Sequence, residues 1–131
     1  MNNIITFEQA KVLKEAGFNR ACAYAYDFNG LLNNRQTFLN TDSSKIVCAP
    51  RLFEIFDWLH QEKKIVIDFK FSRHPNNLED SDLITWMIQS LETGLAVESK
   101  TKCDLMNDTG IYYKAFNDIL PYLQKFFFKE I

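Results

Sequence analysis

The sequence predicts an α+β fold, namely a single small domain over residues 1–131 in which about three helices pack on one mainly antiparallel sheet. Asn29-Gly30 separates two extended runs, which is typical of a tight β-hairpin. Apolar residues alternate along a further strand and recur at helical spacing in three other segments. Of the 131 residues, 47% are apolar and 15% aromatic, which is enough material for a sizeable core.

The first helix is expected near residues 7–16. Thr6 and Gln9 have the spacing of a capping box, in which their side chains satisfy amides left free at a helix N-terminus. Gly17 then favours a left-handed stop, with Phe18 positioned to pack back on the helix.

The hairpin is expected to join strands 21–28 and 31–38 through a two-residue turn in which Asn29 and Gly30 both have positive φ. Because side chains alternate along a strand, the first arm has one aromatic face and one nearly bare face. We expect the aromatic face to bury a large area and the bare face to let another element approach closely. The aromatic face carries Cys22, Tyr24, Tyr26 and Phe28, and the bare face carries Ala21, Ala23, Ala25 and Asp27.

The polar stretch 40–44 predicts an exposed loop. Ala49-Pro50 is expected to open a second helix over 50–62, because the backbone N–H that proline lacks has no partner in the first turn of a helix. Trp58 lies off the apolar stripe of this helix. It is either a lid over the core edge or an exposed anchor for a partner, and we favour the core edge. Alternating apolar residues predict a strand over 64–71, beside the hairpin.

Residues 83–91 fit either a helix or a strand, and we choose a strand that pairs with 95–100. The last helix is expected over 109–128, capped by Asp108 or Thr109. Pro121 predicts a kink or a restart of that helix. Consecutive residues on a helix point about 100° apart, so at least one of Phe126-Phe127-Phe128 must lie outside the core stripe.

Composition argues against several classes of protein. Fifteen basic and seventeen acidic residues give a net charge of −2, and no basic run favours nucleic acid. Three widely spaced cysteines without a CxxC pair predict buried thiols instead of a disulfide framework or a zinc site. No apolar window is long enough for a membrane span, and the N-terminus lacks the features of a secretion signal, so we expect a cytoplasmic protein that does not enter a membrane.

One local group of side chains could support chemistry: Asp68, His74, Glu79, Asp80 and Asp82. A metal-assisted hydrolase around Asp68 and His74 would need two or three of them to converge on an ion or a water molecule. Their spacing fits no ligand motif, and a solvated loop explains them as well. Glycine-rich phosphate loops and the common hydrolase signatures are absent, so we expect no catalytic residue, metal or cofactor.

The residue types instead favour a non-catalytic protein-interaction module that binds an unknown partner or a second copy. The candidate binding residues are the aromatic anchors Tyr24, Tyr26, Trp58, Trp86, Tyr112, Tyr113, Phe127 and Phe128. The competing explanation is that these residues form an aromatic core. A nucleic-acid-binding accessory protein, in which bases stack on an aromatic sheet, is the functional alternative.

The sequence also resembles a group of small uncharacterised proteins of Bacteroidetes genomes and their prophage-like elements. The resemblance rests on the run from Thr6 to Phe18, on Tyr24-Ala25-Tyr26-Asp27 before Asn29-Gly30, on Cys48-Ala49-Pro50, on Trp58-Leu59 and on the helix after Asp108. Tyr113 and Lys114 replace the acidic pair usual in that group. The resemblance implies an α+β architecture and a mobile-element origin, and no catalytic residue.

Overall fold

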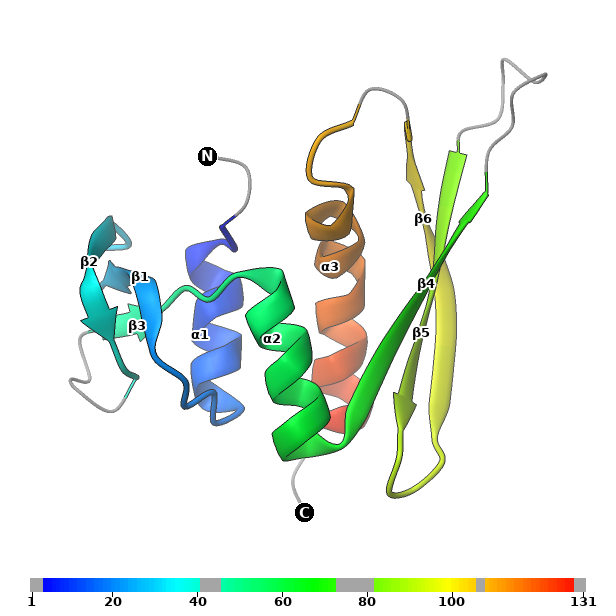
Figure 1. Ribbon diagram of the computed structural model, residues 1–131, viewed down its shortest axis with the longest axis horizontal. Coiled ribbons are helices and arrows are strands. Elements are labelled where there is room, and N and C mark those ends of the chain that lie inside the picture. Colours follow the sequence, from blue (N-terminus) through cyan, green and yellow to red (C-terminus); the bar gives the residue numbers. More distant parts are fainter. Residues whose placement is uncertain (1–3, 41–45, 73–81, 106–107, 129–131) are drawn as a thin grey trace. The chain divides into compact units, whose positions relative to one another are not determined.

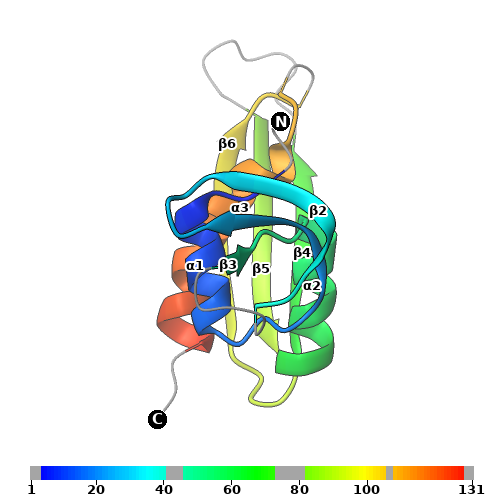
Figure 2. The same ribbon diagram turned by 90° about the vertical axis from the view of Figure 1, so that its left-hand side faces the viewer.

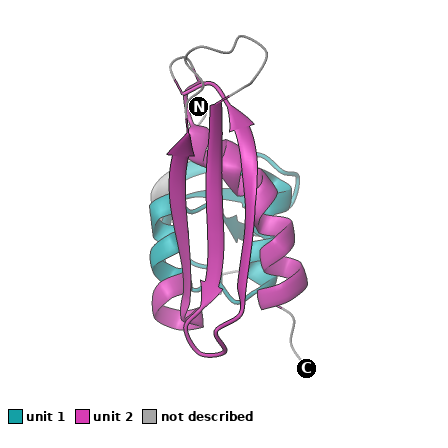
Figure 3. Ribbon diagram, turned by 90° about the vertical axis from the view of Figure 1, so that its right-hand side faces the viewer, with its two compact units in different colours: residues 1, 3–58 teal, residues 2, 59–131 magenta. Residues whose placement is uncertain are grey.

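The computed structural model describes residues 4–40, 46–72, 82–105 and 108–128 and confirms the predicted α+β class. These residues form helices and two three-stranded antiparallel sheets (Figure 1). The chain divides into two compact units that meet in sequence between Trp58 and Leu59 (Figure 3). The single domain over 1–131 stays a prediction, and each unit is taken by itself.

The first unit contains α1 and α2 and a sheet of order β2-β1-β3 (Figure 2). Strand β3 is short and was not predicted. The elements are α1 (Phe7–Glu15), β1 (Cys22–Asp27), β2 (Leu32–Phe38), β3 (Ile46–Cys48) and α2 (Leu52–Trp58).

Both ends of α1 are capped at the predicted residues. The Thr6 hydroxyl accepts from the Gln9 amide at 3.1 Å, and the Gln9 side chain accepts from the Thr6 amide at 2.9 Å. At the other end Gly17 has φ +96°, and the Phe18 amide reaches back to the Leu13 carbonyl at 3.0 Å. This is a Schellman motif, which satisfies carbonyls that the end of a helix leaves free.

The hairpin forms at the predicted place, but its connection has three residues instead of two. The Asp27 amide bonds to the Leu31 carbonyl at 3.0 Å, and the Gly30 amide bonds to the Asp27 carbonyl at 2.9 Å. Among the described non-glycine residues only Lys64 has positive φ, so Asn29 does not, whereas Gly30 has φ +82°. The turn is therefore of the kind that ends in a glycine bulge, in which one left-handed residue is sufficient.

The two predicted faces of the first arm are wrong, because burial does not alternate along β1. Cys22 and Ala25, three positions apart, are both buried, while Tyr24 and Tyr26 are half-buried. The pairing with β2 is irregular at this point: Cys22 is opposite Phe38 and Tyr24 is opposite Asn34, so β2 has two extra residues between these pairs.

Asn40 does not lie in an exposed loop, as the polar stretch had suggested, but is buried. Its side-chain amide donates to the Phe18 carbonyl at 2.9 Å, and its side-chain oxygen accepts from the Cys48 amide at 2.7 Å. Asn40 thus connects the end of the α1 turn to β3. Residues 41–44 of that stretch lie outside the described residues.

Helix α2 begins at Leu52, two residues after Pro50. The Arg51 carbonyl accepts the first helical bond, from Ile55 at 3.1 Å, and the Arg51 amide donates to the Glu54 carboxylate at 3.0 Å. Pro50 therefore precedes the cap instead of occupying the first turn. Trp58 is buried, as we favoured, and its ring meets the edge of Phe18 at a centroid distance of 5.2 Å.

The second unit contains a sheet of order β4-β5-β6 and helix α3. Its strand β4 pairs with β5 along its whole length and not with the hairpin, so the prediction of one sheet is wrong. The choice of strand for 83–91 is confirmed. The elements are the π-helical turn η1 (Leu59–Lys63), β4 (Ile65–Ser72), β5 (Asp82–Ser90), β6 (Ala96–Cys103), α3 (Ile111–Tyr122) and the π-helical turn η2 (Leu123–Phe127).

Helix α3 covers one face of this sheet (Figure 3). It is capped by Gly110, at φ +67°, and not by Asp108 or Thr109. Pro121 does not interrupt it. The α pattern continues to Tyr122 and gives way to π-type bonding only over η2, where the Phe128 amide bonds to the Leu123 carbonyl at 2.7 Å.

No helix among the described residues is long and apolar enough to cross a membrane.

Candidate binding surfaces

The most exposed apolar group of the first unit lies at the β1–β2 turn, and we call it the hairpin tip: Phe28, Leu31 and Leu32. Phe28 is 67% exposed and Leu31 63% exposed, and Leu32 is exposed as well. The prediction missed this site, although its signal was present, because the apolar residues directly flank Asn29-Gly30, where a turn projects into solvent.

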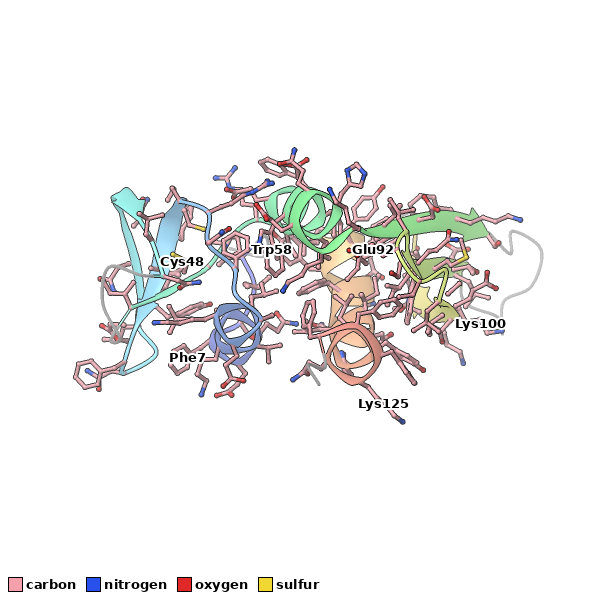
Figure 4. All side chains as sticks on the ribbon, turned by 90° about the horizontal axis from the view of Figure 1, so that it is seen from below. Phe7, Cys48, Trp58, Glu92, Lys100 and Lys125 are labelled. Carbon is pink, nitrogen blue, oxygen red and sulfur yellow. The ribbon has the colours of Figure 1, made fainter. Side chains whose placement is uncertain are left out.

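Local hydrogen bonds hold the hairpin tip in shape. One carboxylate oxygen of Asp27 accepts from the amides of Asn29 at 2.9 Å and Leu31 at 3.1 Å. Beneath the turn, the ring of Phe7 on α1 lies so close to Gly30 that a Cβ atom there would be 3.3 Å from Phe7 Cδ2. Figure 4 labels Phe7 on its helix. The apolar side chains are therefore displayed on a turn that is already ordered.

Tyr24 and Tyr26, the predicted anchors of β1, make contacts within the unit. The Tyr26 hydroxyl donates to the Ile5 carbonyl at 2.6 Å, and its ring lies 5.5 Å from that of Phe7. Burial raises the pKa of Tyr26. The Arg51 guanidinium lies 5.9 Å from the Tyr24 ring. Both tyrosines support the fold with part of their surface and leave only the remainder for a partner.

In the second unit, an aromatic group connects the start of α3 to β4. Tyr112 is 43% exposed, and its ring meets the edges of Phe69 at 5.1 Å and Phe71 at 6.0 Å. Phe71 is also exposed, whereas Tyr113 is half-buried. Tyr112 is therefore the one predicted residue of this helix start that presents a large surface.

The other predicted aromatics are less accessible. Trp58 and Trp86 are both 1% exposed and belong to the core, so in this structure they cannot serve as exposed anchors. Phe127 and Phe128 are half-buried. Of the consecutive phenylalanines Phe126 is the exposed one, at 43%, which confirms that at least one lies outside the core.

The three cysteines are free and buried, as predicted. The pKa of Cys22 is raised, first by its hydrogen bond with Cys48 and then by burial, and burial raises the pKa of Cys103. A raised pKa keeps a thiol protonated at neutral pH, and a protonated thiol is a poor nucleophile. Cys22 and Cys103 therefore behave as small core residues.

The acidic group considered for a metal-assisted hydrolase is only partly described, because His74, Glu79 and Asp80 lie outside the described residues. Asp68 is exposed on β4, and Asp82 accepts the Leu105 amide at 2.8 Å. In the part of the chain that the structure describes, no three histidine, cysteine, aspartate or glutamate side chains gather to hold a metal ion. The metal-assisted hydrolase around Asp68 and His74 stays an alternative hypothesis.

No family model, no curated protein and no solved structure matches this chain. The resemblance to the Bacteroidetes group stays a prediction.

Proposed function

We propose that this chain is a non-catalytic protein-interaction module that inserts the hairpin tip into an apolar groove of a partner protein. The observation that carries the proposal is the exposure of Phe28 and Leu31 on a turn held by Asp27 and by the Phe7–Gly30 contact. Exposed apolar residues that are adjacent to one another favour binding, whereas isolated ones are common on any surface.

Rigidity matters as much as exposure for this function. A turn whose backbone is ordered before binding loses less conformational entropy when the partner arrives than a flexible loop does. Burying the side chains of Phe28 and Leu31 together contributes roughly 3–5 kcal/mol. Association itself costs at least about 4 kcal/mol in lost translational and rotational freedom, so contacts around the tip must supply the affinity of a specific complex.

The nucleic-acid alternative has weaker support. Its best observation is an exposed ring beside a cation, since Lys125 Nζ lies 5.3 Å from the Phe126 ring, on which Tyr122 stacks. One ring and one cation can hold a single base only weakly, whereas single-strand binding proteins combine several rings with a cationic groove. The net charge of −2 also opposes a polyanion.

Site-specific photo-crosslinking tests the interaction directly. A benzophenone amino acid is placed at position 28 or, as a control, at position 53, in cells that make the protein. Phe53 on α2 is 68% exposed, so it matches Phe28 in residue type and accessibility but lies outside the hairpin tip. We expect one protein to be captured from position 28 and not from position 53.

The captured protein is then purified and its affinity for the module is measured by calorimetry. The variant Leu31→Asp should weaken binding by about tenfold or more, because a buried carboxylate is strongly disfavoured, while Phe53→Asp should leave the affinity unchanged. Equal capture from the two positions, or equal affinity of Leu31→Asp and the wild type, would contradict the proposal. Circular dichroism melts establish that both variants are folded.

A further inference from the structure

The sheet of the second unit has a second face, which points away from α3. Tertiary contacts define the inner face, since Phe69 meets Tyr112 and Trp86 meets Tyr122. Because side chains alternate, the neighbouring residues of each strand lie on the opposite side, which we call the outer sheet face. Lys100 on β6 is labelled in Figure 4.

Strand register arranges four of the five charged residues of the outer sheet face in two rows, and the fifth, Lys102 on β6, lies opposite Leu83, beyond the basic row. In the acidic row, Asp68 is opposite Met87, which is opposite Glu98. In the basic row, Lys70 is opposite Thr85, which is opposite Lys100. The rows lie about 7 Å apart along the strands, and the two equal charges of a row lie about 10 Å apart, on the outer strands.

The charges of both rows are available for a partner. Asp68, Lys70, Glu98 and Lys100 are exposed. None of the four has an ion pair or a hydrogen bond with another described side chain. The residues between them, Met87 and Thr85 on β5, are half-buried and uncharged. The surface therefore has a neutral centre with a charged border, which is how protein interfaces are commonly built.

The geometry points to a second copy of this chain as the occupant of the outer sheet face. We infer that two copies stack these faces about a two-fold axis that lies between the sheets, perpendicular to the strands and midway between the rows. This operation places the acidic row of each copy over the basic row of the other. Asp68 then faces Lys70 of the second copy, Glu98 faces Lys100 of the second copy, and each pair occurs twice because the interface is isologous.

The same pattern excludes the other aligned two-fold arrangement. An axis parallel to the strands would place Asp68 over Glu98 of the second copy and Lys70 over Lys100 of the second copy, and like charges repel. Packed sheets are separated by about 10 Å, a distance that an extended lysine and a carboxylate side chain can bridge. The charges thus select the orientation, and the neutral centre supplies the apolar contact.

The size of the face indicates how tight this association is. The outer strands β4 and β6 have eight residues each, and three strands of that length span roughly 400 Å². A stable complex commonly buries about 800 Å² on each partner. We therefore expect a weak dimer that forms in concentrated solution and dissociates when salt screens its ion pairs.

Charge exchange on β4 tests this inference. Sedimentation of the whole chain is measured over a range of concentrations at low and high salt. Asp68→Lys alone makes positions 68 and 70 both basic, and Lys70→Asp alone makes both acidic, so each should weaken self-association by about tenfold or more. The double variant exchanges the two charges, restores complementarity and should dimerise like the wild type. An equimolar mixture of the two single variants should form the mixed dimer.

Two control variants separate this surface from other parts of the chain. Glu92→Lys changes an exposed charge in the β5–β6 turn, outside both rows, and Leu31→Asp changes the hairpin tip. Neither should alter dimerisation.

Three results would overturn the inference. The first is a wild-type chain that stays monomeric at about 1 mM in low salt, because a specific contact with a dissociation constant of about 1 mM would then be half-populated. The others are single variants that dimerise normally and a double variant that dimerises as weakly as the single ones. A polyuridine oligonucleotide that binds at low salt and is lost in Lys100→Glu would assign the face to nucleic acid instead.

Discussion

The ring of Phe7 lies directly beneath Gly30, so that a Cβ atom at position 30 would be only 3.3 Å from Phe7 Cδ2. This contact joins the first turn of α1 to the end of the hairpin. Position 30 therefore requires glycine for two reasons: its backbone angle of φ +82° and the lack of room for a Cβ atom beside the Phe7 ring.

Replacing Gly30 with alanine should therefore destabilise the chain by roughly 1–3 kcal/mol, from the left-handed backbone angle and from crowding against Phe7. Gly94→Ala is the matched control, since Gly94 has φ +79° but a Cβ atom there would have no neighbouring atom within 4 Å. Denaturant melts should show a larger loss for Gly30→Ala. Equal losses would mean that the Phe7 contact contributes nothing.

Asn40→Ala should lower stability strongly, because the Asn40 side chain is the hydrogen-bond partner of two buried backbone groups. The Phe18 carbonyl and the Cys48 amide would be left without their hydrogen bonds. An unpaired buried group costs about 1–3 kcal/mol, so we expect a loss of roughly 2–4 kcal/mol in the free energy of unfolding. Asn33→Ala is the control, since its bond to the Leu31 carbonyl is exposed and its loss should cost under about 0.5 kcal/mol.

Thr101→Val tests a chain of hydrogen bonds in the second unit. The Trp86 indole donates to the Thr101 hydroxyl at 3.1 Å, and that hydroxyl donates to Asp118 at 2.6 Å. Valine has nearly the same shape but leaves the buried indole N–H unpaired, which should cost about 1–3 kcal/mol. Thr85→Val on the outer sheet face makes the same chemical change and should lie within about 0.5 kcal/mol of the wild type. If both variants were equally stable, the hydrogen bond would be energetically silent.

The pair of Asp108 and Lys114 predicts how stability depends on pH. The pKa of Asp108 is lowered by the hydrogen bond that its carboxylate accepts from Lys114, at 2.8 Å, and by a second one from the Asp104 amide. A carboxyl whose pKa is lower in the folded state stabilises the fold above its usual pKa of 3.8 and loses this contribution as the pH falls through the lowered pKa.

Thermal melts of the wild type and Asp108→Asn should therefore differ at neutral pH and converge in strong acid. The hydrogen bond with Asp108 also raises the pKa of Lys114 above 10.5. The contribution of Lys114 to stability is therefore complete below pH 10.5 and is lost as the pH rises through the raised pKa. A difference between the two proteins that persisted at the lowest pH would show that Asp108 acts through something other than its charge.

The sequence predicted which types of residue form the candidate binding surfaces, but not which of those residues are exposed. Aromatic anchors were expected, and Tyr112 is exposed, but Trp58 and Trp86 are in the core and the hairpin tip was not among the predicted residues. Sequence shows which side chains are large and apolar. Whether such a side chain is covered depends on elements distant in the chain, and that information is absent from any local pattern.

The sequence by itself determined the features that form within a few residues. The capping box of Thr6 and Gln9, the stop at Gly17 and the reversal at Asn29-Gly30 follow from local hydrogen bonds and backbone angles, which neighbouring residues decide. Only the tertiary structure decided that β4 pairs with β5 instead of the hairpin, and that Asn40 is buried between Phe18 and Cys48. An alternating strand offers the same backbone groups to any neighbour, so its partner is chosen by long-range packing.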